Sequence, residues 1–296
     1  MTQIPDHGTT RLGSQFYNFR RSLYRFRQSW MSMMGLGIVL VLLLVAGFGG
    51  WFVPYPEHVA GAISADRFVA PGAQYWFGTN EMGQDVFSLV IAGARISLFA
   101  AMAIVLVSAV VGSILGGIAG LVGGFIDDAI MRFVDFMLTV PQLILAMAVA
   151  SAFGPGIVNM IIAVAIASWP GYARLVRGEV LSQKEKPYIA AARVLGASTP
   201  RILFRHILPN IASPIVVKIS LDIGFAILTI ASLGFIGIGV RPPMPEWGTL
   251  LSQARGYMPG YWWIAIFPGL ATMVAVLGFN LLGDGIRDVL DPKARR

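Results

Sequence analysis

The chain lacks cysteine altogether and contains only three histidines among its 296 residues, His7, His58 and His206. The absence of cysteine excludes disulfide bonds, thiolate chemistry and cysteine-based metal sites. Two of the three histidines lie in polar segments. We therefore expect no metal site in this chain.

Charged residues are also scarce. They make up 12% of the chain, against about 25% in an average soluble domain, while hydrophobic residues make up 56%. No Asp, Glu, Lys or Arg occurs in four long runs, residues 28–56, 96–126, 136–173 and 256–283. A helix that spans a membrane needs about 20 apolar residues. These runs exclude a large soluble core and predict an all-α integral membrane protein.

The motifs of a self-contained enzyme are missing. A phosphate-binding loop requires a glycine immediately before its lysine. The four lysines, Lys184, Lys186, Lys218 and Lys293, follow Gln, Glu, Val and Pro instead. The metalloprotease motif HExxH and the nucleophile motif GxSxG are absent as well. We expect no catalytic residue, no nucleotide site and no cofactor within this polypeptide.

The apolar runs predict six membrane spans. Gly154–Pro155–Gly156 divides the longest run into a third and a fourth span, which Pro141 and Pro170 are expected to kink. The other four spans are predicted at residues 31–53, 96–122, 209–237 and 260–283.

The distribution of basic residues predicts the orientation. Segments 1–30, 174–208 and 284–296 hold 16 of the 22 Lys and Arg residues. Cytoplasmic segments of membrane proteins carry such an excess, so both termini are predicted to be cytoplasmic. Because the basic residues flank the spans, the net charge of +7 does not indicate binding of nucleic acid.

This orientation divides the chain into four parts. Residues 1–30 form a cytoplasmic tail, and residues 31–95 form the first span with an extracytoplasmic segment. Residues 96–284 form a core of five spans, and residues 285–296 form a second cytoplasmic tail.

Small residues repeat along the second span. Gly112, Gly116, Gly120 and Gly124 follow one another at a spacing of four, which places them on one helix face. Such a strip lets a neighbouring helix approach closely. We interpret the strip as a packing surface.

Two pairs of opposite charges lie inside or near the predicted spans. Lys218 and Asp222 are one turn apart, about 13 and 20 Å along the helix from Pro209. They either line a translocation path or neutralise each other against a neighbouring helix. Arg132 and Asp135 raise the same question near the end of the third span, where a structural pair is favoured.

The polar segment 187–210 has the local chemistry of two short helices at a corner. Pro187 suits a first helical position and Gly196 suits the residue just past a helix end. Ser198 or Thr199 can cap a second helix. Tyr188, Ala191, Ala192 and Leu195 share one face of the first helix, and the second carries Ile202, Leu203 and Ile207 beside Arg201, Arg205 and His206. This corner either docks into a partner protein or packs on its own spans.

At these residues the chain resembles the "EAA" loop of ABC-importer permeases. The matching residues are Ala191, Ala192, Gly196, Leu208 and Pro209. Ala190 departs from the usual glutamate, which removes one expected ion pair with the ATPase. His206 departs from a frequent isoleucine.

Other stretches resemble the C-type permeases of the dipeptide, oligopeptide and nickel importers, over about residues 20–292. They are Phe77–Gly78–Thr79 with Gly83, Asp85 and Ser88, Met131–Arg132 with Asp135, Leu233–Gly234–Phe235, Pro242–Pro243 with Glu246–Trp247–Gly248, and Gly283–Asp284–Gly285 with Asp291–Pro292.

The resemblance implies a type I importer fold in the bacterial cytoplasmic membrane. It also implies a homologous second permease, two cytoplasmic ATPases that bind ATP and Mg²⁺, and an extracytoplasmic substrate-binding protein. Residues 187–208 would be coupling helices, with ATPase contacts expected at Ala191, Ala192, Arg193, Gly196, Ala197, Arg201 and Pro209.

The expected cargo is a dipeptide or oligopeptide, and the alternatives are nickel, glutathione or a metal–opine complex. An ion-driven secondary transporter is the rival class. It predicts intramembrane acids in repeated positions, whereas Asp222 is nearly alone there.

Overall fold

The computed structural model describes residues 26–290. Within this range the chain is helical, and the one β-type pairing is an isolated bridge between Thr79 and Asp85. Five helices of this range are long and apolar enough to cross a membrane, and a bent pair of shorter helices adds a sixth if the pair forms one span. The prediction of an all-α membrane fold is confirmed, with five to six candidate spans where six were predicted. Most of the two predicted tails, residues 1–25 and 291–296, lies outside the described residues.

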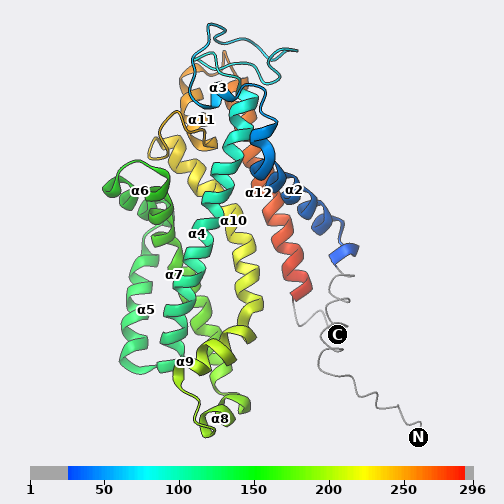
Figure 1. Ribbon diagram of the computed structural model, residues 1–296. Coiled ribbons are helices and arrows are strands. Elements are labelled where there is room, and N and C mark those ends of the chain that lie inside the picture. The colour runs from blue at the N-terminus through cyan, green and yellow to red at the C-terminus, as the bar shows by residue number, and fades with distance from the viewer. Residues whose placement is uncertain (1–25, 291–296) are drawn as a thin grey trace, which may run out of the picture.

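The long helices form one bundle (Figure 1). They are α2 (Trp30–Phe48), α4 (Val86–Val122), α5 (Gly124–Thr139), α6 (Gln142–Phe153), α7 (Ile157–Lys184), α10 (Ala212–Ile236) and α12 (Trp263–Leu290).

Short helices lie at the two ends of the bundle. At the upper end of Figure 1 are η1 (Gly49–Trp51), α3 (Pro56–Val59), α11 (Trp247–Ala254) and η4 (Arg255–Tyr257). At the opposite end are α8 (Pro187–Val194), α9 (Thr199–Arg201), the π-helical turn η2 (Ile202–Ile207) and η3 (Leu208–Ile211).

The second span begins earlier than predicted. Helix α4 starts at Val86, ten residues before the expected boundary at residue 96. The Asp85 carboxylate caps it by accepting hydrogen bonds from the backbone N–H of Ser88 at 2.8 Å and from its hydroxyl at 2.6 Å. Arg95, between apolar stretches, concealed that the helix continues across it.

Pro141 breaks the third span rather than kinking it. Helices α5 and α6 meet there at 94°. Proline has no N–H and clashes with the preceding turn, so the helical ladder ends at Thr139. Pro170, in contrast, lies inside the continuous helix α7.

Three glycines of the predicted strip pack α4 against α7, whereas Gly124 begins α5 and an added Cβ there would meet no atom within 4 Å. A Cβ atom at Gly112 would lie 2.6 Å from the carbonyl oxygen of Trp169, and one at Gly120 would lie 2.9 Å from the Val180 side chain. At Gly116 it would collide with the carbonyl oxygen of Ala173. Only glycine permits this approach of the two backbones.

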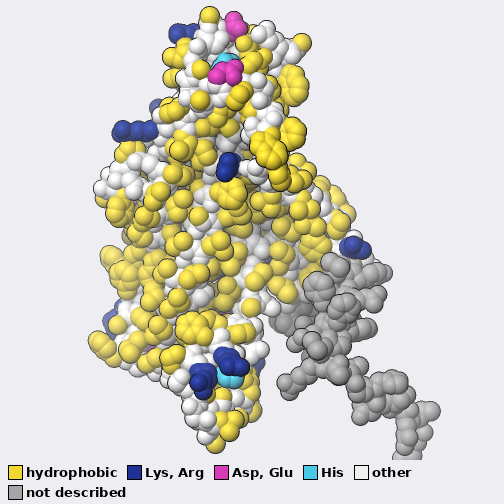
Figure 2. All heavy atoms as spheres, viewed as in Figure 1, with side chains coloured by type: hydrophobic (Ala, Val, Ile, Leu, Met, Phe, Trp, Pro, Cys, Tyr) yellow, Lys and Arg dark blue, Asp and Glu magenta, His cyan; other side chains and the backbone are white. Residues whose placement is uncertain are grey.

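The outer surface matches a membrane protein. Figure 2 shows a broad band of hydrophobic side chains across the middle of the molecule, while charged side chains gather mainly toward its two ends. Such a band is what lipid requires of the helices that face it.

The predicted loop at residues 238–259 contains a helix. Glu246 caps α11 by accepting hydrogen bonds from the N–H groups of Gly248 at 2.8 Å and Thr249 at 2.9 Å. Its carboxylate is fully buried and also accepts from the Ser97 hydroxyl at 3.3 Å. The Trp247 indole donates to the carbonyl of Val90 at 3.0 Å. These contacts hold α11 on α4.

Candidate functional site

The corner begins as the sequence predicts. Pro187 occupies the first turn of α8, and Gly196 follows its end with φ of +77°. The N–H of Gly196 donates to the Arg193 carbonyl at 2.9 Å, and the N–H of Ala197 donates to the Ala192 carbonyl at 3.0 Å. This is a helix end closed by a left-handed glycine.

The second half of the corner differs from the prediction. Ser198 precedes α9 but makes no side-chain cap. Pro209 does not end the unit, because α9 continues through η2 and η3 into α10. The turn widens to a π-helix just before Pro209, which cannot donate to the carbonyl four residues earlier.

The apolar residues in the second half of the corner face inward. Ile202, Leu203 and Ile207 are buried in a cluster with Val176 and Val180 of α7. Of the two alternatives for the corner, packing on its own spans therefore holds for these three side chains, which do not form a docking surface.

Two other apolar side chains form the exposed tip of the corner. Val194 is 87% exposed and Leu195 is 86% exposed, beside the Gly196 turn. Sequence reasoning placed Leu195 on the docking face but missed Val194. Of the predicted coupling residues, Ala191, Arg193, Gly196, Arg201 and Pro209 are exposed, Ala197 is half-buried and Ala192 is buried.

Lys218 and Asp222 form the predicted ion pair in α10. The Lys218 ammonium lies 3.0 Å from an Asp222 carboxylate oxygen, and the two side chains remain 30% and 28% exposed. The ammonium also lies 4.8 Å from the centre of the Tyr172 ring of α7. The pair lines two cavities, of about 90 Å³ and 720 Å³.

Asp135 pairs with a different residue from the one predicted. Its carboxylate accepts from Arg174 of α7 at 2.6 Å, so the expected structural pair with Arg132 is wrong. Asp127, at the start of α5, makes a two-pronged ion pair with Arg177 at 2.5 and 2.7 Å. The sequence prediction used the three-residue spacing between Arg132 and Asp135, and such a local spacing does not reveal partners on another helix.

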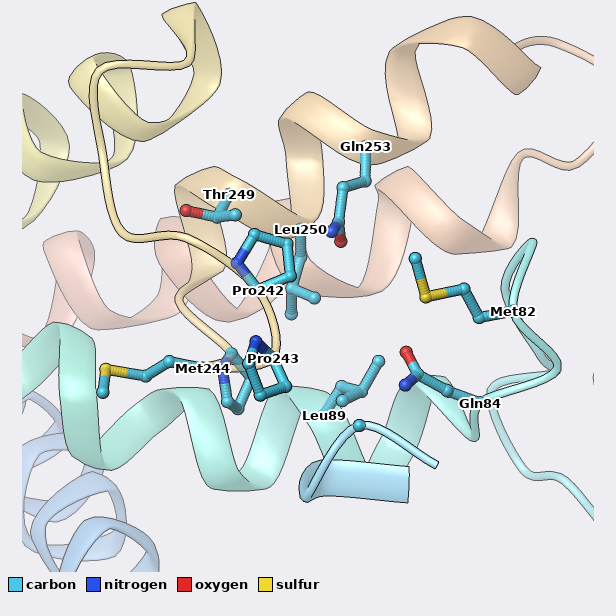
Figure 3. Close-up of a pocket in the computed structure, with 11 residues that line it drawn as sticks. Met82, Gln84, Leu89, Pro242, Pro243, Met244, Thr249, Leu250 and Gln253 are labelled. Atoms are coloured by element: carbon cyan, nitrogen blue, oxygen red, sulfur yellow. The ribbon is translucent and has the colours of Figure 1, made fainter. Parts of the chain in front are cut away.

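A third cavity lies at the end opposite the corner, between the segment that joins α2 to α4 and the loop before α11. Met82 and Gln84 face Pro242, Pro243 and Gln253 across it (Figure 3). Its volume is about 200 Å³, and no charged side chain lines it. We interpret it as a seam between two loops.

The comparisons with known proteins place the chain. A family model described as "Binding-protein-dependent transport system inner membrane component" matches residues 112–296. The chain belongs to this family. A second model, described as "N-terminal TM domain of oligopeptide transport permease C", matches residues 18–71. The permease is therefore a multi-pass subunit of an ABC importer in the bacterial inner membrane.

Two similar relatives cover nearly the whole permease. It is 47% identical to the glutathione transport system permease protein GsiD of Escherichia coli O6:K15:H31, over 92% of this chain and 89% of the relative. It is 40% identical to the probable D,D-dipeptide transport system permease protein DdpC of Escherichia coli strain K12, over 94% and 93%. The family resemblance of the sequence is confirmed.

Proposed function

We propose that this permease carries peptides inward through a complex with a homologous second permease, two cytoplasmic ATPases and an extracytoplasmic substrate-binding protein. The observation that carries the proposal is the corner: a rigidly anchored loop whose apolar tip, Val194 and Leu195, is exposed. An exposed apolar tip on an anchored base suits insertion into a groove of another protein.

The corner then transmits force. Its buried side chains, Ile202, Leu203 and Ile207, join it to α7, and η3 joins it to α10. Movement of an ATPase bound to the tip would therefore move both α7 and α10. In this proposal the corner and both termini are cytoplasmic, ATP and Mg²⁺ bind to the ATPases, and this chain holds no nucleotide, metal or catalytic residue.

The proposed cargo follows from the relatives. Their names specify glutathione and D,D-dipeptides, both of which are small peptides. Nickel and metal–opine complexes remain the alternative cargo of the same machine. Selection is expected to lie mainly in the binding protein, which is a separate chain.

Reconstitution of the complex into proteoliposomes tests the proposal. Uptake of labelled glutathione and of a labelled dipeptide is measured with all subunits, and then with the ATPases or the binding protein left out. We expect uptake only with the full set and ATP. Uptake of equal rate without the ATPases would instead support an ion-driven transporter.

A further inference from the structure

Lys218 and Asp222 lie where two cavities meet. The smaller cavity is bordered by α4, α6, α7 and α10, and includes Gln142, Ser168 and Tyr172. The larger opens between α7, α10 and α12 toward the corner end, where Glu179 and Asn210 line it. Of the residues that line these two cavities, Lys218 and Asp222 alone belong to both.

The polar groups around this junction have unused bonding capacity. The Lys218 ammonium can donate three hydrogen bonds, yet its one ion pair within the described chain is with Asp222. The Tyr172 hydroxyl lies beside the Asp222 carboxylate but is in hydrogen-bond geometry with none of the described residues. A buried hydroxyl without a partner is unusual, because the loss of its hydrogen bond to water is unfavourable.

The charge of the junction selects the kind of ligand that can enter it. The Lys218–Asp222 pair is neutral overall and partly exposed. A zwitterion can open this pair and form two new ones without changing the net charge within the membrane. A bare cation or anion would leave one charge unpaired, which is strongly unfavourable away from water.

We propose that Lys218 and Asp222 form a subsite for an ammonium and a carboxylate of one small peptide, an inference that rests on the proposed function. In glutathione both groups are at the γ-glutamyl end, and in a dipeptide they are at the two termini. The substrate carboxylate pairs with the Lys218 ammonium and accepts from the Tyr172 hydroxyl. The substrate ammonium pairs with the Asp222 carboxylate. When the substrate leaves toward the corner end, the internal pair forms again.

Direct binding tests the subsite. The complex of both permeases and both ATPases is held in nanodiscs with a non-hydrolysable ATP analogue and no binding protein. Radiolabelled glutathione and alanylalanine are each compared with their N-acetylated forms and with forms amidated at one carboxyl, which in glutathione is the α-carboxyl of the γ-glutamyl residue. We expect removal of either charge to weaken binding at least tenfold. Equal binding of the native and capped peptides would overturn the proposal.

Variants locate the effect. Lys218→Met with Asp222→Leu removes the pair without leaving an unpaired charge, and should abolish the preference for uncapped peptides. The exchange Lys218→Asp with Asp222→Lys should restore it, because a zwitterion can bind in the reverse direction. The matched control, Arg174→Met with Asp135→Leu, removes an ion pair that lines neither cavity. It should keep the wild-type preference.

Two failures are distinguishable. A wild-type complex that imports neither peptide with ATP and its binding protein contradicts the proposed function. A complex that imports peptide, but keeps its preference when Lys218 and Asp222 are both apolar, contradicts the subsite alone.

Discussion

Among the glycines of α4 that face α7, Gly116 is the one where an added Cβ would come nearest to a backbone atom of α7. An added methyl group would collide with the backbone of Ala173, which cannot move as a flexible side chain can. We predict that Gly116→Ala lowers the free energy of unfolding by about 1–3 kcal/mol through overpacking. Thermal melting of the purified permease in detergent measures the effect.

The control for this prediction is Gly178 on α7, where an added Cβ meets no atom within 4 Å. Gly178→Ala should be neutral or stabilising by up to ~1 kcal/mol, because alanine favours the helix. Equal destabilisation by both substitutions would show that close helix packing is not the cause.

Glu246 gives a prediction that depends on pH. Burial raises the pKa of its carboxyl above the ordinary value, although the donors at Gly248 and Thr249 oppose the shift. The folded state therefore favours the neutral form. The stability that Glu246 contributes is present below its unfolded pKa, about 4.3, and is lost as pH rises through the folded pKa.

We expect the melting temperature of the wild type to fall, relative to that of Glu246→Gln, as pH rises from about 4 to about 8. The glutamine keeps one of the two acceptor oxygens of the α11 cap and does not ionise. The melting temperature of each protein is measured at several pH values across this range. A constant difference between the two melting temperatures at all pH values would contradict the prediction.

At the scale of helices, we expect the two ion pairs that join α5 to α7 to contribute differently to the free energy of unfolding. Asp127 is 13% exposed and Arg177 is 34% exposed, whereas the Asp135–Arg174 pair is exposed on both sides. Arg177→Met leaves a mostly buried carboxylate unpaired, so we predict a loss of about 1–3 kcal/mol. Arg174→Met should cost less than about 1 kcal/mol.

Chemical denaturation of the two variants in detergent checks this order. A larger loss of unfolding free energy for Arg174→Met than for Arg177→Met would show that burial does not determine how much each ion pair stabilises the fold.

The tip of α8 gives a prediction about assembly. Leu195→Ser should leave melting unchanged, because the side chain is 86% exposed, and should weaken capture of the ATPases about tenfold. The matched control is Ile63→Ser, which alters an exposed apolar residue at the other end of the molecule. Capture of the ATPases is measured by pull-down from detergent, and equal capture by both variants would exclude the tip as the contact.

The helices themselves were largely predictable from the sequence. Apolar runs located the five candidate spans and the bent pair of α5 and α6, and Pro187 with Gly196 located α8. Helix α11 was missed because it is short, and its cap, Glu246, stands among prolines that favour a loop. The direction of the corner's side chains was missed because Ile202 and Val194 are equally apolar, and only contact with α7 separates them.

Across the whole molecule, the resemblance of the corner to a permease loop identified the family, which the relatives confirm. The partners of Asp127 and Asp135 could not be predicted in the same way, since 50 and 39 residues separate them from Arg177 and Arg174. Such pairs depend on how the helices meet, which local spacing does not specify.

In the proposed function, energy enters this permease from the ATPases through the corner. Gly196 has φ of +77° with open space around its Cβ position, so Gly196→Val acts through backbone strain rather than collision. Gly256→Val, in open space at the opposite end with an ordinary φ, is the control.

The deciding measurement is the number of peptides imported per ATP hydrolysed, in proteoliposomes that hold the complete complex. For Gly196→Val we predict normal membrane insertion, continued hydrolysis and a ratio at least tenfold below wild type, while Gly256→Val keeps the wild-type ratio. An unchanged ratio for Gly196→Val would contradict the account.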